Sequence, residues 1–321
     1  MTWTPEKISE LATGYWASQA LLAAVEVGLF EALPAPATEA CARAGIDPRV
    51  GEMLLDALVA IGLVVRNGET YAVDPSAAPS LSARSPVSMV GALRFNSAMY
   101  AMWGKLGDAV KTGQPVVPPG GHLGADPART RGFVMGMHSR ALALLPPVAA
   151  AIDLGNATTL LDVGSGAGTL GRMLAEKNPD LRVTLLDLPA ITDVARELTA
   201  AHPTAARATH LAANYLTAPL PSPYDAVLHC GALHQHSAAD ATALIARLTA
   251  ATHPGGRVVV VDLLAGPAFS MLFALNMALI SPQSRMHSPA EVRQYFLAAG
   301  LDDVRDHSVG ALYHLVSGAR R

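Results

Sequence analysis

Three glycines stand at alternate positions in the segment LLDVGSGAGTL, residues 160–170. An acid, Asp162, precedes them, and a second acid, Asp187, ends the next apolar run. Glycine lets the backbone turn tightly and approach a ligand closely, and a carboxylate can accept hydrogen bonds from both hydroxyls of a ribose. The pattern predicts a site for a ligand that contains a ribose.

The spacing of the glycines argues against a dinucleotide. A dinucleotide fingerprint, G-x-G-x-x-G, would place a glycine at position 169, where the chain has Thr169. The pattern present is D-x-G-x-G-x-G, with Gly164, Gly166 and Gly168. It suits a ligand without a pyrophosphate, whose amino-acid part passes over the loop.

A group of histidines follows the apolar run at 224–230. His229, His234 and His236 lie close together in sequence. Histidine titrates near a pKa of about 6.5 and free phenol near about 10, so a histidine within reach of a hydroxyl can act as a general base. A loop histidine in local hydrogen bonds is one alternative, and a metal site that includes Cys230 is another. Adjacent strand residues point to opposite faces, so we expect no metal.

These residues need a sheet to bring them together. The short apolar runs TTLLDV, LRVTLLDL, YDAVLHC and GRVVVVDLL alternate with helical segments from residue 158 onward. This alternation indicates an α/β fold with parallel strands covered on both faces, and such sheets bind ligands beyond the carboxyl ends of their strands. The segments around Gly310 predict an edge hairpin. Ser288, Pro289 and Glu291 predict a capped helix start.

Residues 1–105 follow a different, mostly helical pattern. Two short helices joined at 45–48 are followed by Asn67–Gly68 between two β-prone runs, which predicts a hairpin. Together these elements form a winged-helix pattern. Acidic residues outnumber arginines here, and the whole chain carries a net charge of −3. Because phosphate contacts need basic side chains, we expect a dimerisation module and no nucleic-acid partner.

The segment 106–150 connects the two halves. KTGQPVVPPGGHLGADP, residues 111–127, is rich in glycine and proline and predicts a loop. A helix then resumes, and Pro146 is expected to end or kink it. We therefore expect a helical domain over 1–105 and a catalytic domain over 106–321, in which 106–150 supplies a linker and a pocket helix.

Composition is that of an ordinary folded protein of 321 residues, 51% of them hydrophobic. The only cysteines, Cys41 and Cys230, suggest no disulfide framework and fit a reducing cytoplasm. The apolar stretches at 20–33 and 269–280 are too charged or too short to span a bilayer. We interpret them as buried helices, with a subunit interface as one place for them. We expect a cytoplasmic protein without a membrane partner or a signal peptide.

The ordered motifs resemble those of class I S-adenosylmethionine (SAM) methyltransferases. They are most similar to the small-molecule O-methyltransferases of the hydroxyindole, caffeate and bacterial polyketide type. The resemblance rests on LLDVGSGAGTL, VTLLDLPAI, LAANYLTAPLPSPYDAVLHCGALHQHSAADA and HPGGRVVVVDLL. LLAAVEVGLFEAL and LLDALVAIGLVVRNGETYAV are similar to that group's winged-helix dimerisation domain. The resemblance implies a Rossmann-like SAM-methyltransferase sheet and a homodimer through the N-terminal domain. It also implies SAM as cofactor and S-adenosylhomocysteine (SAH) as its product.

The resemblance also implies which residues hold the cofactor. The three glycines would lie under the methionine part of SAM, Asp187 would bind the ribose, and Leu188 would press on the adenine. The other implied cofactor contacts are Asp162, Asn214, Tyr215 and Cys230. The family Asp that receives the adenine amino group corresponds to Asn214, whose amide oxygen can still accept a hydrogen bond.

For catalysis, the family base in an LHDW motif corresponds to His234 in LHQH, and a family Glu that orients it corresponds to Asp262. A second orienting Glu corresponds to Met286, and the Asp after the base to Gln235. Three possibilities stay open. His234 acts with Asp262 alone, or the acceptor is acidic enough to need little help, or the reaction is C-methylation or not a methylation.

We expect methyl transfer to a hydroxyl of a small cyclic or aromatic acceptor, with His234 as general base. The sequence does not separate O- from C- or N-methylation. A SAM-fold protein without methyl transfer and a winged-helix regulator with a cofactor-sensing domain are alternatives. His138 and His287 are further candidate bases. The expected acceptor-binding residues are Phe133, Met137, His138, Met271, Asn276, Met277 and His287.

Overall fold

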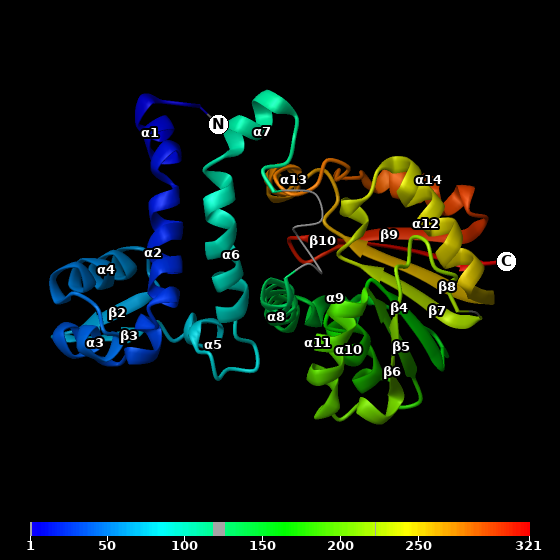
Figure 1. The fold of residues 1–321 in the computed structure, drawn as a ribbon, viewed down its shortest axis with the longest axis horizontal. Helices are drawn as coiled ribbons and strands as arrows, with labels where there is room; N and C mark the ends of the chain where they lie inside the picture. The colour runs from blue at the N-terminus through cyan, green and yellow to red at the C-terminus, as the bar shows by residue number, and fades with distance from the viewer. Residues whose placement is uncertain (1, 118–125, 222) are drawn as a thin grey trace. The chain divides into compact units, whose positions relative to one another are not determined.

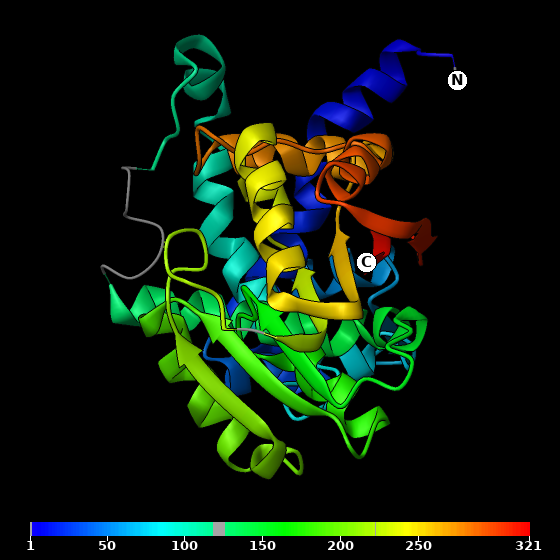
Figure 2. The ribbon, with the colours of Figure 1, turned by 90° about the vertical axis from the view of Figure 1, so that its right-hand side faces the viewer.

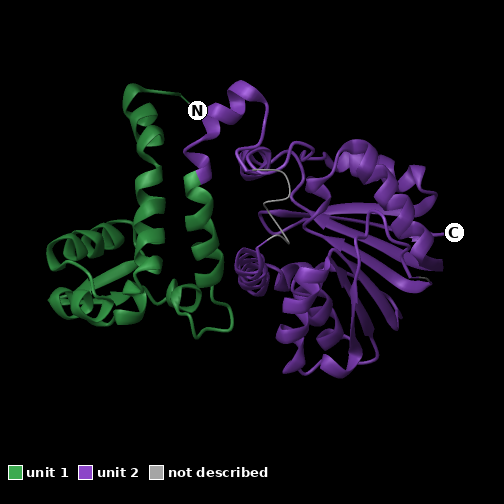
Figure 3. Ribbon diagram, in the orientation of Figure 1, with its two compact units in different colours: residues 1–101 green, residues 102–321 purple. Residues whose placement is uncertain are grey.

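The computed structural model of the chain describes residues 2–117, 126–221 and 223–321. It divides into two compact units, Met1–Ala101 and Met102–Arg321 (Figure 3). The domain boundary expected from the sequence, near 105, lies a few residues later. No helix within the described ranges is long and apolar enough to cross a membrane.

The first unit combines helices with a small sheet. Its helices are α1 (Pro5–Thr13), α2 (Tyr15–Glu26), the 3₁₀ helix η1 (Leu29–Ala32), α3 (Ala37–Ala44), α4 (Pro48–Ala60), α5 (Ala78–Leu81) and most of α6 (Val90–Trp103). Its strands are β1 (Ala35–Pro36), β2 (Val64–Asn67) and β3 (Thr70–Val73). The predicted hairpin is confirmed, since β2 and β3 are antiparallel and Asn67 pairs with Thr70. Helices α3 and α4 followed by this hairpin complete the winged-helix pattern.

The second unit is built around a seven-stranded sheet (Figure 1). Its strands are β4 (Thr159–Val163), β5 (Arg182–Asp187), β6 (Ala208–Ala212), β7 (Tyr224–Cys230), β8 (Thr252–Asp262), β9 (Leu301–Val309) and β10 (Tyr313–Arg320). Their order is β6-β5-β4-β7-β8-β10-β9. The first five in this order are parallel, and β10 is antiparallel to both β8 and β9. The predicted parallel sheet with a C-terminal edge hairpin is confirmed.

Helices cover both faces of this sheet (Figures 1 and 2). The helices of this unit are α7 (Leu106–Thr112), α8 (Pro127–Leu144), α9 (Pro146–Ala151), α10 (Thr169–Lys177), α11 (Pro189–Ala200), η2 (Ala205–Arg207), η3 (Leu233–Gln235), α12 (Ala238–Ala251), α13 (Ala268–Ala278) and α14 (Pro289–Ala298). Successive strand residues point to opposite faces. Val227 of β7 packs with residues of α12 and α14, whereas Ala226 and Leu228 pack with residues of α9 and α10. Burial on both faces explains why the strands read as continuous apolar runs.

Two helix predictions can be compared with the structure. Helix α8 ends at Leu144 and Pro146 begins α9, as expected of a proline. The loop expected over 111–127 includes residues 118–125, which lie outside the described residues. Helix α7 takes its first two positions.

The expectation that 269–280 forms a buried helix is wrong for the single chain. Phe269, Met271 and Leu272 of α13 are 47%, 52% and 57% exposed. Only one stripe of the helix, which includes Met277, packs into an apolar cluster of its own unit. Apolarity alone does not reveal whether the same chain supplies the surface that covers a helix.

Candidate active site

The turn from β4 into α10 carries the glycine motif. Gly164, Gly166 and Gly168 have positive φ angles of 71°, 55° and 71°. The backbone N–H groups of Gly164 and Ser165 donate to the carbonyl oxygen of Leu186 at 2.8 and 3.1 Å. These bonds hold the glycine loop, residues 164–168, against the carboxyl end of β5.

Two of these glycines are required for different reasons. A Cβ on Gly168 would lie 2.5 Å from Cδ1 of Leu185, whereas a Cβ on Gly166 would have nothing within 4 Å. Gly168 therefore allows the loop to pack closely on β5, and Gly166 faces open space. An open backbone surface of this kind fits a ligand that must approach the loop closely.

Asp187 joins this loop to the neighbouring strand tip. Its Oδ2 accepts the N–H of Gly166 at 2.7 Å, and its Oδ1 accepts the N–H of Leu188 at 2.7 Å. Burial raises the pKa of Asp187, and these two N–H groups oppose that shift. The carboxyl group therefore lies where a ligand that crosses the loop could meet it.

Asp162 supports the loop from within β4. It is 2% exposed, and burial together with the nearby charge of Asp187 raises its pKa to about 7. A Cβ on Gly171 of α10 would lie 2.8 Å from Oδ2 of Asp162. The carboxyl group is thus packed under the first turn of α10.

The remaining expected cofactor residues surround the loop. Leu188 packs in an apolar cluster with Ala167, Ile191 and Val194. Asn214 is exposed, and its side-chain oxygen accepts the N–H of Leu216 at 3.0 Å. That oxygen has a second lone pair and can accept another donor.

Tyr215 lies in the segment after β6, and Cys230 ends β7. A Cβ on Gly164 would lie 3.3 Å from Cε1 of Tyr215, so this ring lies against the glycine loop. Its hydroxyl is 3.0 Å from Nε2 of His236. Burial raises the pKa of the Cys230 thiol well above its usual value, which keeps this group neutral.

The three histidines have separate environments. His229 is fully buried, and its Nδ1 donates to the carbonyl oxygen of Val163 at 2.8 Å. Burial lowers the pKa of His229, and it lowers that of His236 to about 4. Among the residues that the structure describes, no three His, Cys, Asp or Glu side chains are grouped to hold a metal ion.

His234 forms a tight pair with Asp262. Its Nδ1 is 2.7 Å from Oδ1 of Asp262, and its backbone N–H donates to Oδ2 at 3.0 Å. Burial alone would raise the pKa of Asp262, but His234 and the surrounding N–H groups outweigh it and hold this pKa below its usual value. The ionised carboxylate therefore accepts the Nδ1–H, which leaves Nε2 of His234 as the lone-pair nitrogen.

The His234 ring also contacts an apolar side chain. The ring of Phe273 in α13 meets it edge-on, with ring centroids 5.0 Å apart. Met286, which the resemblance matches to a second orienting carboxylate, packs with Leu263 and Met277. The histidine thus has a single carboxylate partner among the described residues.

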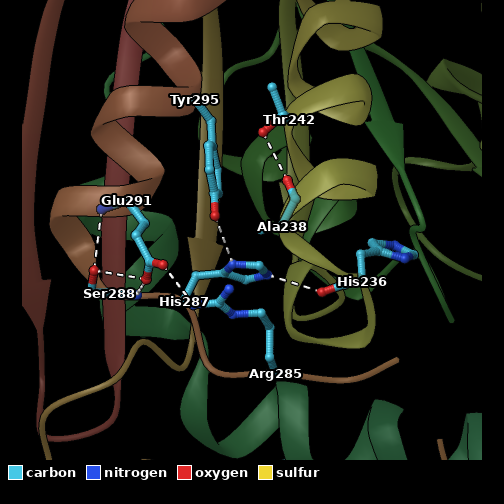
Figure 4. Close-up of polar contacts among 8 residues, drawn as sticks. All are labelled: His236, Ala238, Thr242, Arg285, His287, Ser288, Glu291 and Tyr295. Carbon is cyan, nitrogen blue, oxygen red and sulfur yellow. Dashed lines mark hydrogen bonds and ion pairs between the residues drawn. The ribbon is translucent and has the colours of Figure 1, made fainter. Parts of the chain in front are cut away.

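His287 is held between two polar partners (Figure 4). Its Nε2 is 3.2 Å from the carbonyl oxygen of His236, and its Nδ1 is 3.2 Å from the Tyr295 hydroxyl. The carbonyl can only accept, so Nε2 carries the proton and Nδ1 accepts from the tyrosine. Figure 4 also shows the predicted capping box of α14, in which Ser288 and Glu291 bond to each other. Both ring nitrogens of His287 are engaged within the fold.

The expected acceptor-binding residues lie on two helices. On α8, Phe133 packs in the same apolar cluster as Leu188, and Nδ1 of His138 is 2.8 Å from Oγ1 of Thr169. Met137 is half-buried. The α8 residues therefore lie near the glycine loop.

On α13, Asn276 and Met277 lie one turn beyond Phe273, whereas Met271 is exposed. Phe273 was not predicted from the sequence, and neither was Trp103, whose Nε1 donates to Oδ1 of Asn276 at 2.9 Å. The three-residue spacing between Phe273 and Asn276 was the available signal for a shared helix face.

Comparisons with known proteins identify relatives of this chain. Residues 103–302 match the O-methyltransferase domain, and residues 9–80 match the O-methyltransferase dimerisation domain. Tetracenomycin polyketide synthesis 8-O-methyl transferase TcmO of Streptomyces glaucescens is 35% identical over 98% of this chain and 97% of its own length. 3-Hydroxy-5-methyl-1-naphthoate 3-O-methyltransferase of Streptomyces sahachiroi is 33% identical over 94% of this chain and 90% of its own length. Human N-acetylserotonin methyltransferase, solved in complex with SAM, has a TM-score of 0.90 and 23% identity, and the match covers 100% of this chain and 98% of that one.

Proposed function

This chain belongs to the family of SAM-dependent O-methyltransferases, and we propose that it methylates a hydroxyl of a small aromatic acceptor with His234 as the general base. Two relatives support an aromatic acceptor, since their names specify a tetracenomycin polyketide and a naphthoate. The single observation that carries the choice of base is the 2.7 Å contact between Nδ1 of His234 and Asp262.

The residues at the tips of β4 and β5 fit SAM. Bound SAM supplies an electrophilic methyl group on a sulfonium centre. The open backbone face at Gly166 suits its amino-acid part, and the Asp187 carboxyl group suits its ribose hydroxyls. Leu188 offers an apolar surface to the adenine. Asp162, Asn214, Tyr215 and Cys230 complete the proposed cofactor-binding set.

Within this site the chain's own groups move one proton. Asp262 fixes the Nδ1–H of His234, so Nε2 accepts the proton of the acceptor hydroxyl as the oxygen becomes nucleophilic. The ionised Asp262 then stabilises the imidazolium that forms. Because Met286 supplies no second carboxylate, this arrangement favours an acidic, phenolic hydroxyl over an aliphatic one.

The test compares His234→Ala with His307→Ala, a control on the exposed edge strand β9. Methyl transfer from SAM to a panel of naphthols and hydroxyanthraquinones is followed by mass spectrometry. We expect kcat to fall roughly 10²–10⁴-fold in His234→Ala and to stay at the wild-type level in the control. Both variants should bind SAH as the wild type does. Full turnover by His234→Ala would reject this base. SAH binding without methylation of any phenol would favour C-methylation or a non-methylating reaction.

We further infer a homodimer formed through the N-terminal unit. The match of residues 9–80 to the dimerisation domain supports it. Ile8, Leu11 and Trp16 of α1 and α2 are 56%, 69% and 63% exposed, and such apolar surface is typical of an interface. Sedimentation velocity should give twice the 33.3 kDa mass of one chain, and a monomer at micromolar concentration would contradict the inference. The cytoplasmic location stays a prediction.

A further inference from the structure

Helix α13 is apolar except for Ser270 and Asn276. Oδ1 of Asn276 accepts the indole N–H of Trp103 at 2.9 Å. An indole N–H can only donate, so the orientation of the amide is determined by chemistry: its oxygen faces Trp103, and its two Nδ2 hydrogens remain. Among the described residues, Nδ2 has no hydrogen-bond partner.

The helix places this amide on the same side as the general base. Asn276 follows Phe273 by three residues, and residues at that spacing share a helix face. The Phe273 ring contacts His234. Met277, the next residue, packs with Met286 and Leu263, which adjoins Asp262 in sequence. A fixed hydrogen-bond donor thus stands one helical turn from the aromatic ring that contacts the proposed base.

We propose that Trp103 holds Asn276 as a donor for a carbonyl oxygen of the acceptor, so that the enzyme selects hydroxyarenes that also carry a ketone or quinone carbonyl. The inference rests on the proposed function and specifies its substrate class. Asn276 binds the substrate, and Trp103 is a positioning residue. An analogue without the carbonyl oxygen leaves a desolvated donor unpaired, which weakens its binding.

The test measures equilibrium binding to the SAH-saturated protein by calorimetry. Its probes are matched pairs: 1-hydroxyanthraquinone with 1-hydroxyanthracene, and 2-hydroxyanthraquinone with 2-hydroxyanthracene. The readout is the ratio of the two affinities within a pair, which a general loss of stability does not change. The wild type should bind the quinone of at least one pair about tenfold more tightly.

Three variants separate positioning from structure. Asn276→Asp keeps an oxygen for Trp103 but replaces the Nδ2 donor with a second oxygen, so the preference for the quinone should vanish or invert. Trp103→Phe removes the indole donor and frees the amide to rotate, which should reduce the preference severalfold. Trp103→His supplies an N–H donor again and should restore part of the preference for the quinone. A purely structural role for Trp103 would leave the ratio unchanged in Trp103→Phe and in Trp103→His.

The outcomes also separate this inference from the proposed function. An equal ratio in the wild type and Asn276→Asp, or no binding of any of the four compounds, overturns the inference. Methylation of the same compounds, followed by mass spectrometry, is the second arm. Methylation without a carbonyl preference rejects the inference and leaves the proposed function standing. A binding preference without methyl transfer rejects the proposed function instead.

Discussion

At the scale of single residues, the His234–Asp262 pair explains how one carboxylate can orient the proposed base. Besides the His234 ring, Asp262 accepts the backbone N–H of His234 and that of Leu263, the latter at 2.7 Å. These bonds fix the carboxylate before any ligand binds. A carboxylate that is already fixed holds one imidazole tautomer without help from the position of Met286.

Replacement of Asp262 by Asn tests this tautomer argument. The amide can present its NH₂ group to Nδ1, which would then lose its proton to Nε2 and leave no lone pair for the substrate. We expect kcat to fall by roughly 10²–10⁴-fold with little change in the affinity for SAH. Single-turnover methyl transfer and calorimetry measure the two quantities. A nearly wild-type kcat in Asp262→Asn would show that tautomer control by the carboxylate is not needed.

The resemblance favoured His234 over His138 and His287 as the base. Residue types and spacing alone could not rank the three, because the ranking depends on which ring nitrogen is free. His287 uses both nitrogens within the fold. His138 bonds to Thr169, and burial, with Arg172 nearby, lowers its pKa to about 4. His234 alone of the three is paired with a carboxylate. These partners come from β8, α10 and α14, and no local sequence pattern encodes such contacts.

At the scale of elements, the glycine loop offers a matched pair of substitutions. Gly168→Ala adds a Cβ that clashes with Leu185 and strains a positive φ, so it should destabilise the unit by about 2–4 kcal/mol. Gly166→Ala has the same backbone strain but no clash, and should cost about 1–2 kcal/mol. Its Cβ points into the open space proposed for SAM, so it should weaken SAH binding at least as strongly as Gly168→Ala. Thermal unfolding and calorimetry of both variants would decide, and equal stability losses would contradict the packing argument.

Elements with strong local signals were predictable from sequence. The Asn67–Gly68 hairpin, the α14 capping box and the strand run into the glycines each depend on residues that are close in sequence. The exposure of α13 was not predictable from sequence. Hydrophobicity indicates that an apolar helix is buried against something, but it does not indicate whether the same chain or another chain supplies the contacting surface. The Trp103–Asn276 hydrogen bond was also not predictable, because the two residues lie far apart in sequence.

At the scale of the whole molecule, the two units carry separate tasks. Residues 9–80 match a dimerisation domain and residues 103–302 match the methyltransferase domain, so the proposed cofactor site and base both belong to the second unit. Patterning favours such a division, since residues 1–105 are mostly helical by pattern and strands alternate with helices from residue 158 onward. The acceptor was not predictable in the same way, because its contacts depend on side chains from several helices.

The stability of the folded chain should depend on pH through Asp162, whose pKa of about 7 in the folded state lies above its value of about 3.9 in an unfolded chain. Below about pH 4 both states hold the proton, and Asp162 has no effect. Between about pH 4 and 7 the unfolded state loses its proton first, so stability falls as pH rises, and the full penalty is present above about pH 7.

Asp162→Asn removes that titration while keeping an oxygen for the α10 backbone. The variant should therefore gain stability over the wild type, and the gain at pH 8 should exceed the gain at pH 5 by about 2.5 kcal/mol. Asp262, whose pKa is lowered, contributes stability that is lost only as pH falls, and it is common to both proteins. Chemical unfolding of the wild type and the variant at the two pH values measures the difference. If the free energies of unfolding of the wild type and the variant differ by the same amount at both pH values, Asp162 has the same pKa in the folded and the unfolded chain, which contradicts the prediction.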